Sequence, residues 1–329
     1  MKVLAGDIGG TKTALAVVDV DGRRLQVQSL ETFPSANFDD LDEIVRQFIN
    51  TQHPACDYAS FGIAGPVHNG ICTTTNLPWR VDARRLAADL GLRQAWLLND
   101  LEANAWGIDT LDDADFLMLN EGDPQAGGNA AIISAGTGLG QAGLFRDGTR
   151  YRPFASEGGH TDFAPASELE IALLRYLQKQ YDHVSWERVV SGMGLINIHA
   201  FLSDFRHSET PDWLAEQLRD GDAAAVISNA ALTQRCPVCS EALDLFVHLY
   251  GVEAGNQALK LMATGGVYIG GGIAPRIIDK LREPDFLYGF QSKGRMEPLM
   301  RSMPVRVILN PLTALRGAAV YAETVLNAS

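Results

Sequence analysis

The chain opens with Val3-Leu4-Ala5-Gly6-Asp7-Ile8-Gly9-Gly10-Thr11-Lys12-Thr13, an apolar strand that runs into a glycine-rich turn. A second apolar strand, Ala14-Leu15-Ala16-Val17-Val18, follows the turn directly. Because glycine carries no Cβ, the backbone amides of such a turn can converge on phosphate oxygens. The Asp7 carboxylate at the start of the turn can hold Mg2+ through water molecules. The opening therefore predicts a β-hairpin that binds one part of a polyphosphate.

The same plan returns at mid-chain, in Ala131-Ile132-Ile133-Ser134-Ala135-Gly136-Thr137-Gly138-Leu139-Gly140-Gln141-Ala142-Gly143-Leu144-Phe145. Neither turn has the spacing of a Walker A loop or of a G-x-G-x-x-G turn that leads into a helix, so those two mechanisms do not apply. A single glycine turn between apolar strands is a weak signal, since most such turns bind nothing. Two matched hairpins indicate a chain of two halves, each of which holds part of a polyphosphate.

Composition limits the classes of partner. The chain has 329 residues, of which 46% are hydrophobic, and this length predicts about two domains. The net charge of −13 argues against nucleic acid or an anionic membrane as the main partner. The sequence contains no run of 18 or more apolar residues, so no transmembrane helix is expected. The segment Met1–Asp7 becomes polar too early for a signal peptide, so we expect a cytoplasmic protein.

Strands and helices alternate over the first hundred residues, which indicates an α/β domain. A second unit is expected to begin near Asp112 and to contain long helices. The longest helical pattern covers Ala223 to Ala263, and we expect two helices there that meet near Gly251. No low-complexity tract or flexible linker is evident, which predicts two domains that adjoin at a cleft.

Two of the four cysteines form the motif Cys236-Pro237-Val238-Cys239. A zinc site normally needs two further cysteines or histidines at suitable spacing, and none lies beside the pair in the sequence. A thioredoxin-type role requires a βαβ context, whereas the surroundings have a helical pattern. We therefore expect two reduced thiols on the face of a helix.

A polar pair, Asn99-Asp100, follows the apolar strand Ala95–Leu98. In open α/β sheets ligands bind beyond the carboxyl ends of the strands, so this pair is well placed. An aspartate there can accept a hydrogen bond, and later a proton, from an attacking hydroxyl group. The alternative is that Asp100 simply caps the following helix, Leu101–Gly107. Both roles are compatible.

The segment Ser156-Glu157-Gly158-Gly159-His160-Thr161-Asp162-Phe163 places a carboxylate and an imidazole three residues apart in a glycine-containing loop. Both side chains can hydrogen-bond to the hydroxyl groups of one polyol. A metal half-site of the form E-x-x-H usually lies on a helix, and the two glycines argue against one. A purely structural role for His160 is the remaining alternative.

A third glycine cluster, Gly265-Gly266-Val267-Tyr268-Ile269-Gly270-Gly271-Gly272-Ile273-Ala274, brackets a short strand. Glycine on both sides of a strand allows a flat ring such as adenine to lie against the backbone, although tight helix–strand packing has the same signature. Glu187, in Trp186-Glu187-Arg188-Val189-Val190-Ser191-Gly192, has no local signal of its own and looks like a solvated helix residue.

Taken together, these segments resemble the bacterial glucokinase family, in the superfamily of sugar kinases, actin and heat-shock chaperone ATPases. The resemblance runs from about Met1 to Ala319. It implies nucleotide contacts in the two hairpins and the third glycine cluster, at Gly6, Asp7, Ile8, Gly9, Gly10, Thr11, Lys12, Gly136, Thr137, Gly138, Gly265, Gly266, Gly270 and Gly271. It also implies that Asp100 is the catalytic base and that Asn99, Glu157, His160 and Glu187 hold the sugar hydroxyl groups.

The resemblance implies a two-domain α/β fold of the actin-like, or ribonuclease H-like, ATPase type, with nucleotide and sugar in the interdomain cleft. The small domain is expected at 1–111, completed by a returning helix at 315–329, and the large domain at 112–314. The implied cofactors are ATP and Mg2+, with Asp7 holding Mg2+ through water, and a homodimer is expected. Related repressor and kinase proteins carry a cysteine-rich zinc motif after the sugar-site histidine, whereas Thr161–Tyr176 contains no cysteine, so the chain resembles the zinc-free branch.

The implied reaction is ATP-dependent phosphorylation of D-glucose to glucose 6-phosphate, the first step of glycolysis. Two alternatives remain open at this stage. One is a kinase for another hexose or an amino sugar such as N-acetylmannosamine, which would share every ATP feature. The other is a non-catalytic, sugar-responsive regulator. Regulators of that kind carry a DNA-binding segment ahead of the kinase-like core, whereas this acidic chain begins at the phosphate hairpin.

Overall fold

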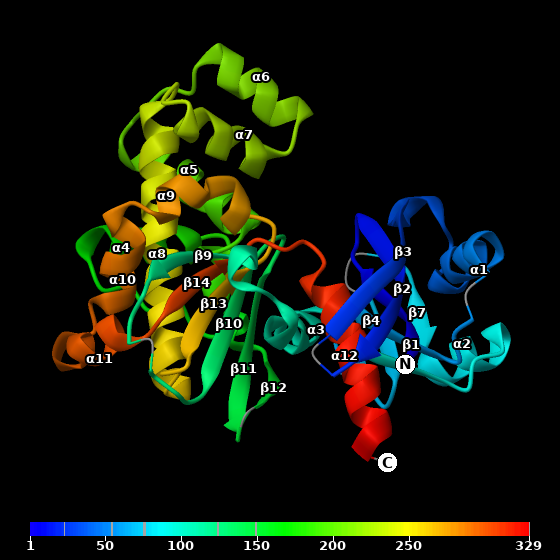
Figure 1. The fold of residues 1–329 in the computed structure, drawn as a ribbon. Helices are drawn as coiled ribbons and strands as arrows, with labels where there is room; N and C mark the ends of the chain where they lie inside the picture. Colours follow the sequence, from blue (N-terminus) through cyan, green and yellow to red (C-terminus); the bar gives the residue numbers. More distant parts are fainter. Residues whose placement is uncertain (23, 54, 75–76, 124, 149, 329) are drawn as a thin grey trace. The chain divides into compact units, whose positions relative to one another are not determined.

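The computed structural model describes residues 1–329 apart from 23, 54, 75, 76, 124, 149 and 329. Its residues cluster into two compact units (Figure 1). Unit 1 comprises Met1–Asp115, Leu144–Ala155 and Asn310–Ser329, and unit 2 comprises Phe116–Gly143 and Ser156–Leu309. The domain bounds expected from the sequence, 1–111 with 315–329 and 112–314, stay a prediction, and Ser329 lies outside the described residues.

Unit 1 is built on a five-stranded sheet of order β3-β2-β1-β4-β8. The first three strands form an antiparallel meander, and β4 and β8 continue the sheet in parallel with β1. The strands are β1 (Lys2–Ile8), β2 (Lys12–Asp21), β3 (Arg24–Pro34), β4 (Tyr58–Ile63) and β8 (Gln94–Asn99). A small antiparallel sheet contains β5 (Val67–His68), β6 (Ile71–Thr73) and β7 (Arg80–Asp82).

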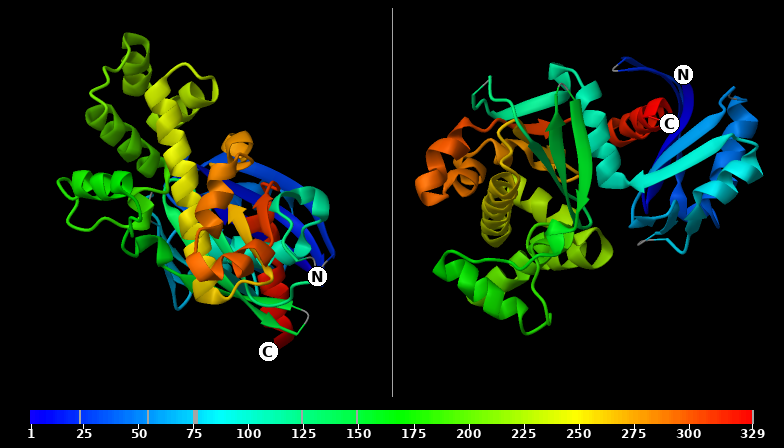
Figure 2. Two further views of the ribbon diagram at one scale, coloured as in Figure 1. Left: turned by 90° about the vertical axis from the view of Figure 1, so that its left-hand side faces the viewer. Right: turned by 90° about the horizontal axis from the view of Figure 1, so that it is seen from below.

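Strand alternation divides the core of unit 1 between the two faces of the larger sheet. Val3 and Ala5 of β1 pack with residues of α12 (Thr313–Ala328), whereas Leu4 and Ile8 pack with α1 (Leu41–Gln52) and α2 (Ala83–Leu90). Figure 2 shows α12 on one face of this sheet and α1 and α2 on the other. The period of two along a strand therefore produces two apolar layers from one segment.

Helix α3 (Asp100–Gly107) packs against α12 with almost no side chain between the two backbones. A Cβ atom on Gly317 would lie 1.8 Å from the Ala103 carbonyl oxygen, and one on Gly107 would lie 2.1 Å from the carbonyl oxygen of Thr313. The two glycines therefore permit this close crossing. Because α3 begins at the end of β8, the crossing also fixes where Asp100 lies.

A six-stranded sheet repeats the strand plan of the five-stranded one. Most of it belongs to unit 2, whereas the end of β11 and nearly all of β12 lie in the segment Leu144–Ala155 of unit 1. The order is β12-β11-β10-β13-β14-β9, so β10, β11, β12, β13 and β14 occupy the places of β1, β2, β3, β4 and β8. The strands β13 and β14 run parallel to β10, and β9 is antiparallel at the edge. Their bounds are β9 (Phe116–Asn120), β10 (Ala130–Ala135), β11 (Leu139–Asp147), β12 (Arg150–Ser156), β13 (Gly266–Gly270) and β14 (Val305–Ile308). The repeat inferred from the two hairpins is confirmed.

Helices supply most of the core of unit 2. The longest, α8, packs against α5, α7 and α10 and reaches β10 and β13. The helices of this unit are α4 (Glu168–Leu177), α5 (Gly192–Phe205), α6 (Asp212–Asp220), α7 (Ala223–Leu232), α8 (Pro237–Leu261), α9 (Ile278–Leu281), α10 (Pro284–Gln291) and α11 (Glu297–Ser302). Among the described residues, no helix combines the length and the hydropathy needed to cross a membrane.

The expected helix break near Gly251 is wrong. Helix α8 runs through Gly251 without interruption. The glycine serves packing instead, because a Cβ there would lie 2.0 Å from the Phe286 carbonyl oxygen of α10. The break lies instead after Leu232, where α7 ends, and α8 restarts at Pro237 with Cys236 as its N-cap. Proline is favoured at the first position of a helix because it has no N–H to leave unpaired.

We predict that Gly317→Ala destabilises the protein, although alanine in a helix is normally more stable than glycine by about 1 kcal/mol. The added methyl group must displace the backbone of α3, and overpacking of this kind costs about 1–3 kcal/mol. Thermal unfolding measures the change. Gly127→Ala is the control, since no atom lies within 4 Å of its added Cβ. A higher melting temperature for Gly317→Ala would contradict the packing argument.

Candidate active site

The first glycine turn joins β1 to β2 and is braced from outside. The Gly9 amide donates to the Lys12 carbonyl oxygen at 3.0 Å, which closes the turn. Ser35, at the start of the short helix η1 (Ser35–Asn37), donates its hydroxyl to the Gly9 carbonyl at 2.8 Å and its amide to the Thr11 carbonyl at 3.1 Å. Within the described part of the chain, the Gly10 and Thr11 amides make no hydrogen bond. Two adjacent donors are thus left for an anion.

Carboxylates gather at the carboxyl ends of the parallel strands beside this turn. Parallel pairing puts Asp7 opposite Gly62 of β4 and Asn99 opposite Ile63, so Asp7, Asn99 and Asp100 lie at one edge of the sheet. Burial, together with the charge of Asp100, raises the pKa of Asp7 to about 6, and Lys12 opposes this shift. A carboxylate held against a like charge in a partly buried place favours a bound cation.

Asn99, and not Asp100, is the N-cap of α3. The Asn99 Oδ1 atom accepts from the amides of Leu101 at 3.0 Å and Glu102 at 3.4 Å, while its Nδ2 donates to the Gly65 carbonyl at 3.2 Å. Asp100 is the first helical residue, and its Oδ1 accepts from the Leu101 amide at 2.9 Å. The capping function considered for Asp100 therefore belongs mainly to its neighbour, which holds Asp100 at the end of β8.

The second glycine turn, between β10 and β11, follows the same construction with different braces. The Gly136 amide donates to the Gly138 carbonyl at 2.9 Å, and the Gly136 carbonyl accepts from the Gly192 amide at 2.8 Å. The Thr137 and Gly138 amides make no hydrogen bond to any described residue. Both turns thus use the first glycine amide for closure and leave the next two amides free for an anion.

Glu187 braces this second turn, so its interpretation as a solvated helix residue is wrong. It lies in the short helix η5 (Trp186–Arg188), and its Oε2 accepts from the Leu139 amide at 2.9 Å. A Cβ atom on Gly138 would lie 2.4 Å from that oxygen. Ser191 donates its hydroxyl to the Glu187 carbonyl at 2.7 Å and caps α5. Among the described residues, Glu187 Oε1 makes no hydrogen bond.

Glu157 precedes the short helix η4 (Gly158–His160) and His160 is its last residue; the helix lies against the start of β11. A Cβ on Gly159 would lie 2.0 Å from the Leu139 carbonyl oxygen, and one on Gly158 would lie 2.1 Å from Gln141 Oε1. The two glycines are therefore required by packing. The His160 Nε2 and Glu157 Oε2 atoms lie 3.9 Å apart, and both side chains are exposed.

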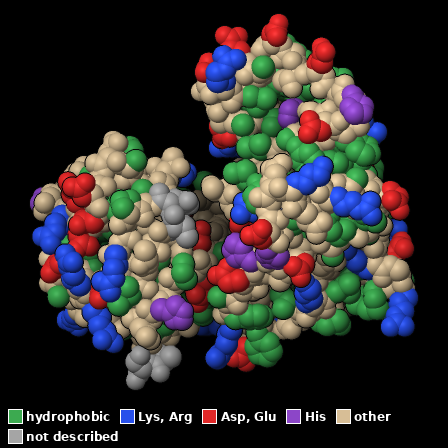
Figure 3. Space-filling model, turned by 180° about the vertical axis from the view of Figure 1, so that it is seen from behind, with side chains coloured by type: hydrophobic (Ala, Val, Ile, Leu, Met, Phe, Trp, Pro, Cys, Tyr) green, Lys and Arg blue, Asp and Glu red, His purple; other side chains and the backbone are tan. Residues whose placement is uncertain are grey.

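His160 and Glu187 line one cavity of unit 2, with a volume of about 340 Å3. Figure 3 shows neighbouring histidine side chains bordered by acidic ones on the surface of this unit. The remaining lining residues are Gln180, Tyr181, Asp182, His183, Ser185 and Arg188. The cavity thus offers carboxylate, imidazole and hydroxyl groups, a set that suits a polyol.

The third glycine cluster is split between two edges of the sheet. Gly270 pairs with Ser134 at the carboxyl ends of β13 and β10, and a Cβ on Gly271 (φ +83°) would lie 2.3 Å from the Ala135 carbonyl. These glycines share an edge with Gly136. Gly265 and Gly266 lie at the opposite end of β13, where Gly266 pairs with Ala130. The structure therefore does not bring Gly265 and Gly266 together with the second turn.

Within unit 1 the structure brings together Asp7, the first turn, Asn99 and Asp100; within unit 2 it brings together Gly136, Gly138, Glu187 and His160. Gly6 is a packing glycine, because a Cβ there would lie 2.6 Å from the ring of Phe61. Sequence reasoning missed Ser35 and Ser191. Ser35 is 26 residues from the carbonyl that it binds, so no local pattern could have found it, whereas Ser191 precedes a helix and carried a detectable N-cap signal.

Comparisons with known proteins identify the family of the chain. The profile of the glucokinase family matches residues 4–325. A glucokinase of Nostoc punctiforme is 45% identical over 335 residues, which span 97% of this chain and 98% of that protein. A glucokinase of Synechocystis is 43% identical, with 97% of each chain covered.

Two solved structures have a similar fold. The crystal structure of a glucokinase from an Antarctic psychrotroph has a TM-score of 0.85 and 32% identity, covering 98% of this chain and 99% of that one. A ROK family glucokinase from Streptomyces griseus, solved in complex with glucose and AMPPNP, shares the fold with a TM-score of 0.65 and 23% identity, covering 98% and 100%. The fold is the two-domain, actin-like ATPase fold, and this chain belongs to the glucokinase family.

Proposed function

We propose that this chain transfers the γ-phosphoryl group of ATP to the 6-hydroxyl group of D-glucose. The observation that carries the proposal is the pair of glycine turns, each of which leaves two adjacent amides for phosphate oxygens. Membership of the glucokinase family supports both the reaction and the sugar. Phosphoryl transfer depends mostly on positioning and electrostatics, and fixed backbone donors supply both without rearrangement.

Mg2+ fits the residues at the end of β1. Asp7 is a partly buried carboxylate whose pKa is raised to about 6 by burial and by Asp100, so a bound cation would relieve the repulsion between the two acids. We propose that Asp7 holds Mg2+ through water. When bound, the ion would neutralise charge on the phosphate oxygens.

Asp100 is proposed as the base. It lies at the end of β8, held by the Asn99 cap and by its own hydrogen bond to the Leu101 amide. Its carboxylate would orient the sugar hydroxyl group and accept the proton as the bond to phosphorus forms. Asn99 keeps one N–H of its side-chain amide for the sugar after it donates to Gly65.

The remaining sugar contacts are proposed for Glu157, His160 and Glu187. Glu187 can accept from a hydroxyl group through Oε1 while Oε2 stays on the Leu139 amide. The expectation that both ligands bind in an interdomain cleft stays a prediction. We also propose a cytoplasmic homodimer that acts at the first step of glycolysis; these points rest on the family resemblance alone.

A coupled assay for glucose 6-phosphate tests the function and the base together. We expect activity in the wild type and a loss of kcat by about 10²–10⁴-fold in Asp100→Asn, the usual contribution of a general base. Asparagine keeps the oxygen that accepts from Leu101, so the helix start is preserved. Nucleotide binding, measured by calorimetry, should persist.

Glu102→Gln is the matched control. Glu102 lies in the same helix as Asp100, and its carboxylate has no assigned role. If Asp100→Asn retained more than about a tenth of the wild-type kcat, the base would be assigned wrongly. Equal kcat/KM for glucose and N-acetylmannosamine would overturn the sugar and leave the kinase assignment intact.

Asp7 is predicted to oppose stability when no cation is bound. Its raised pKa means that protonation favours the folded state; this contribution is complete below about pH 4 and is lost as the pH rises through about 6. Asp7→Asn should therefore raise the free energy of unfolding at pH 7 by about 2–3 kcal/mol without Mg2+, and the gain should vanish toward pH 4. Urea unfolding at both pH values measures it.

The same variant should lose Mg2+-dependent activity. Asp21→Asn, at the exposed end of β2, serves as the control and should change stability by less than about 0.5 kcal/mol. An Asp7→Asn protein less stable than the wild type at pH 7 would show that the surroundings stabilise the Asp7 carboxylate, which is the opposite of the expected repulsion.

His160→Ala should raise the KM for glucose by about 3–10-fold, the usual effect of losing one uncharged hydrogen bond. The melting temperature should not change, because the side chain is 63% exposed. His183→Ala is the control: His183 lines the same cavity and binds Asp162 at 2.8 Å, but it has no proposed contact. Equal effects of the two substitutions would contradict the assignment of His160.

A further inference from the structure

Two thiols and an imidazole from separate helices meet in the core of unit 2. His199 comes from α5, Cys236 is the N-cap of α8 and Cys239 lies in the first turn of α8. One ring nitrogen of His199 and both Sγ atoms all lie within 4.8 Å of one another. The three residues are 7%, 4% and 0% exposed. The sequence placed no histidine near the cysteine motif, because His199 precedes it by almost forty residues.

The local structure turns both sulfur atoms toward one place. The break after α7 makes Cys236 an N-cap, and its Sγ accepts from the Cys239 amide at 3.4 Å. Residues three apart at a helix start share one face. A thiolate is the form of cysteine that binds a metal ion, so binding of an ion here would release the thiol protons.

His199 is the observation that separates this cluster from ordinary buried thiols. A buried imidazole normally has a hydrogen-bond partner. The ring of His199 makes no hydrogen bond to any residue that the structure describes, and the Ser203 hydroxyl donates to its backbone carbonyl. An imidazole with no protein partner, aimed at two sulfur atoms, has the arrangement of a metal ligand.

We propose that His199, Cys236 and Cys239 bind a borderline-soft divalent cation of the Zn2+ class. Bond lengths of about 2.3 Å to sulfur and 2.0–2.1 Å to nitrogen place tetrahedral ligand atoms under 4 Å apart, which a small contraction of the present cluster provides. Two thiolates, one neutral imidazole and one divalent ion have no net charge, so the set can remain buried. The fourth position is left to water, because the described residues supply three ligands.

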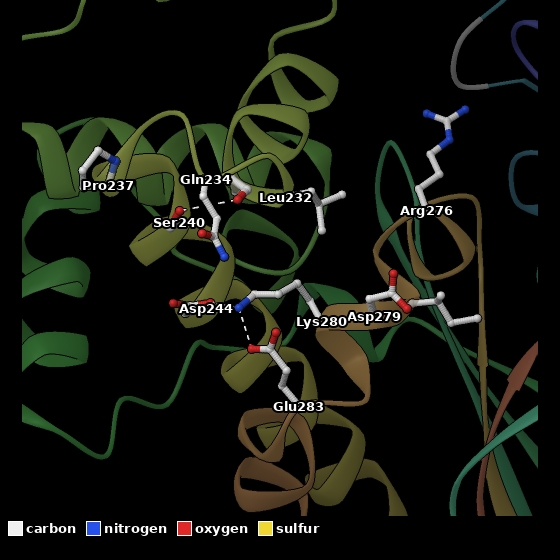
Figure 4. A pocket seen from close by; sticks show the side chains of 11 residues that line it. Leu232, Gln234, Pro237, Ser240, Asp244, Arg276, Asp279, Lys280 and Glu283 are labelled. Atoms are coloured by element: carbon white, nitrogen blue, oxygen red, sulfur yellow. Dashed lines mark hydrogen bonds and ion pairs between the residues drawn. The ribbon is translucent and has the colours of Figure 1, made fainter.

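A second group of metal-compatible side chains, Asp244, Glu283 and Asp285, shows the contrast. Figure 4 shows Lys280 reaching toward Asp244 and Glu283, and its Nζ lies 2.6 Å from an oxygen of each. The Lys280 ammonium group therefore already neutralises part of the charge of that group. The adjoining cavity, about 580 Å3, is lined by Pro237 and Ser240 but by neither cysteine, so an ion at the thiol site would exchange slowly with solvent.

The site would fasten α5 to the first turn of α8, the longest helix of the core. We therefore expect a structural ion that stabilises unit 2 and takes no part in phosphoryl transfer. This function does not depend on the proposed glucokinase activity.

Titration of the reduced, metal-free wild type with Co2+ tests the proposal, because cobalt bound to thiolate absorbs in the near ultraviolet. We expect saturation at one Co2+ per chain, displacement by Zn2+ and a melting temperature that falls when Zn2+ is chelated. Cys236→Ser and Cys239→Ser should abolish the absorption, and His199→Gln should weaken binding by at least tenfold. Cys72→Ser, at a buried cysteine of unit 1, should behave as the wild type.

The wild-type titration decides the matter even where a variant fails to fold. No thiolate absorption with Co2+ under reducing conditions would overturn the proposal. A Cys236–Cys239 disulfide that persists in excess reductant, detected by intact mass, would overturn it too, because the thiolates would then not exist. Full Co2+ binding by folded Cys236→Ser would equally exclude this ligand set.

Discussion

One hydrogen bond, from the Leu139 amide to Glu187 Oε2 at 2.9 Å, holds the second glycine turn against the segment that carries the proposed sugar contacts. A side chain at position 138 would collide with that carboxylate, so the position requires glycine. The Gly192 amide then binds the Gly136 carbonyl, and Ser191 binds the Glu187 carbonyl. Glu187 is therefore fixed before any ligand arrives. A donor or acceptor held in this way needs no reorganisation when charge develops.

Unit 1 reaches the same turn geometry by another route. Its sheet repeats the order of the larger sheet, but the Ser35 hydroxyl and amide brace its turn, and no carboxylate of the described residues does so. The difference has a physical reason. A carboxylate beside the first turn would add to the repulsion between Asp7 and Asp100, whereas serine is neutral. Among the residues that the structure describes, no such carboxylate pair lies at the strand ends beside the second turn, so that turn tolerates Glu187.

Sequence patterns predicted the features that are local. The two hairpins, the α/β class, the Asn99-Asp100 pair at a strand end and the proximity of Glu157 to His160 all follow from spacing within a few residues. Contacts between residues far apart in the sequence were not predicted. Ser35, the amide that Glu187 binds and the approach of α10 that explains Gly251 depend on residues far apart in the chain. The places of Gly265 and Gly266 were not predicted either, since glycines on both sides of a strand lie at opposite ends of that strand.

Several buried carboxylates among the described residues have protein partners. Glu253, fully buried, accepts from Gln141 and Asn256 at 2.7 and 3.0 Å, and Glu170 accepts from the Ala166 amide. Two other clusters of polar side chains differ from these pairs in the groups that face one another. Asp7 and Asp100 are like charges at one sheet edge, and His199 faces two thiols without a hydrogen bond to any described residue. The two proposed cations would suit these clusters differently: a hard, exchangeable ion beside the oxygen ligands at the first glycine turn, and a softer, retained ion beside sulfur. The chemistry of the donor atoms, rather than their burial, thus separates the two positions.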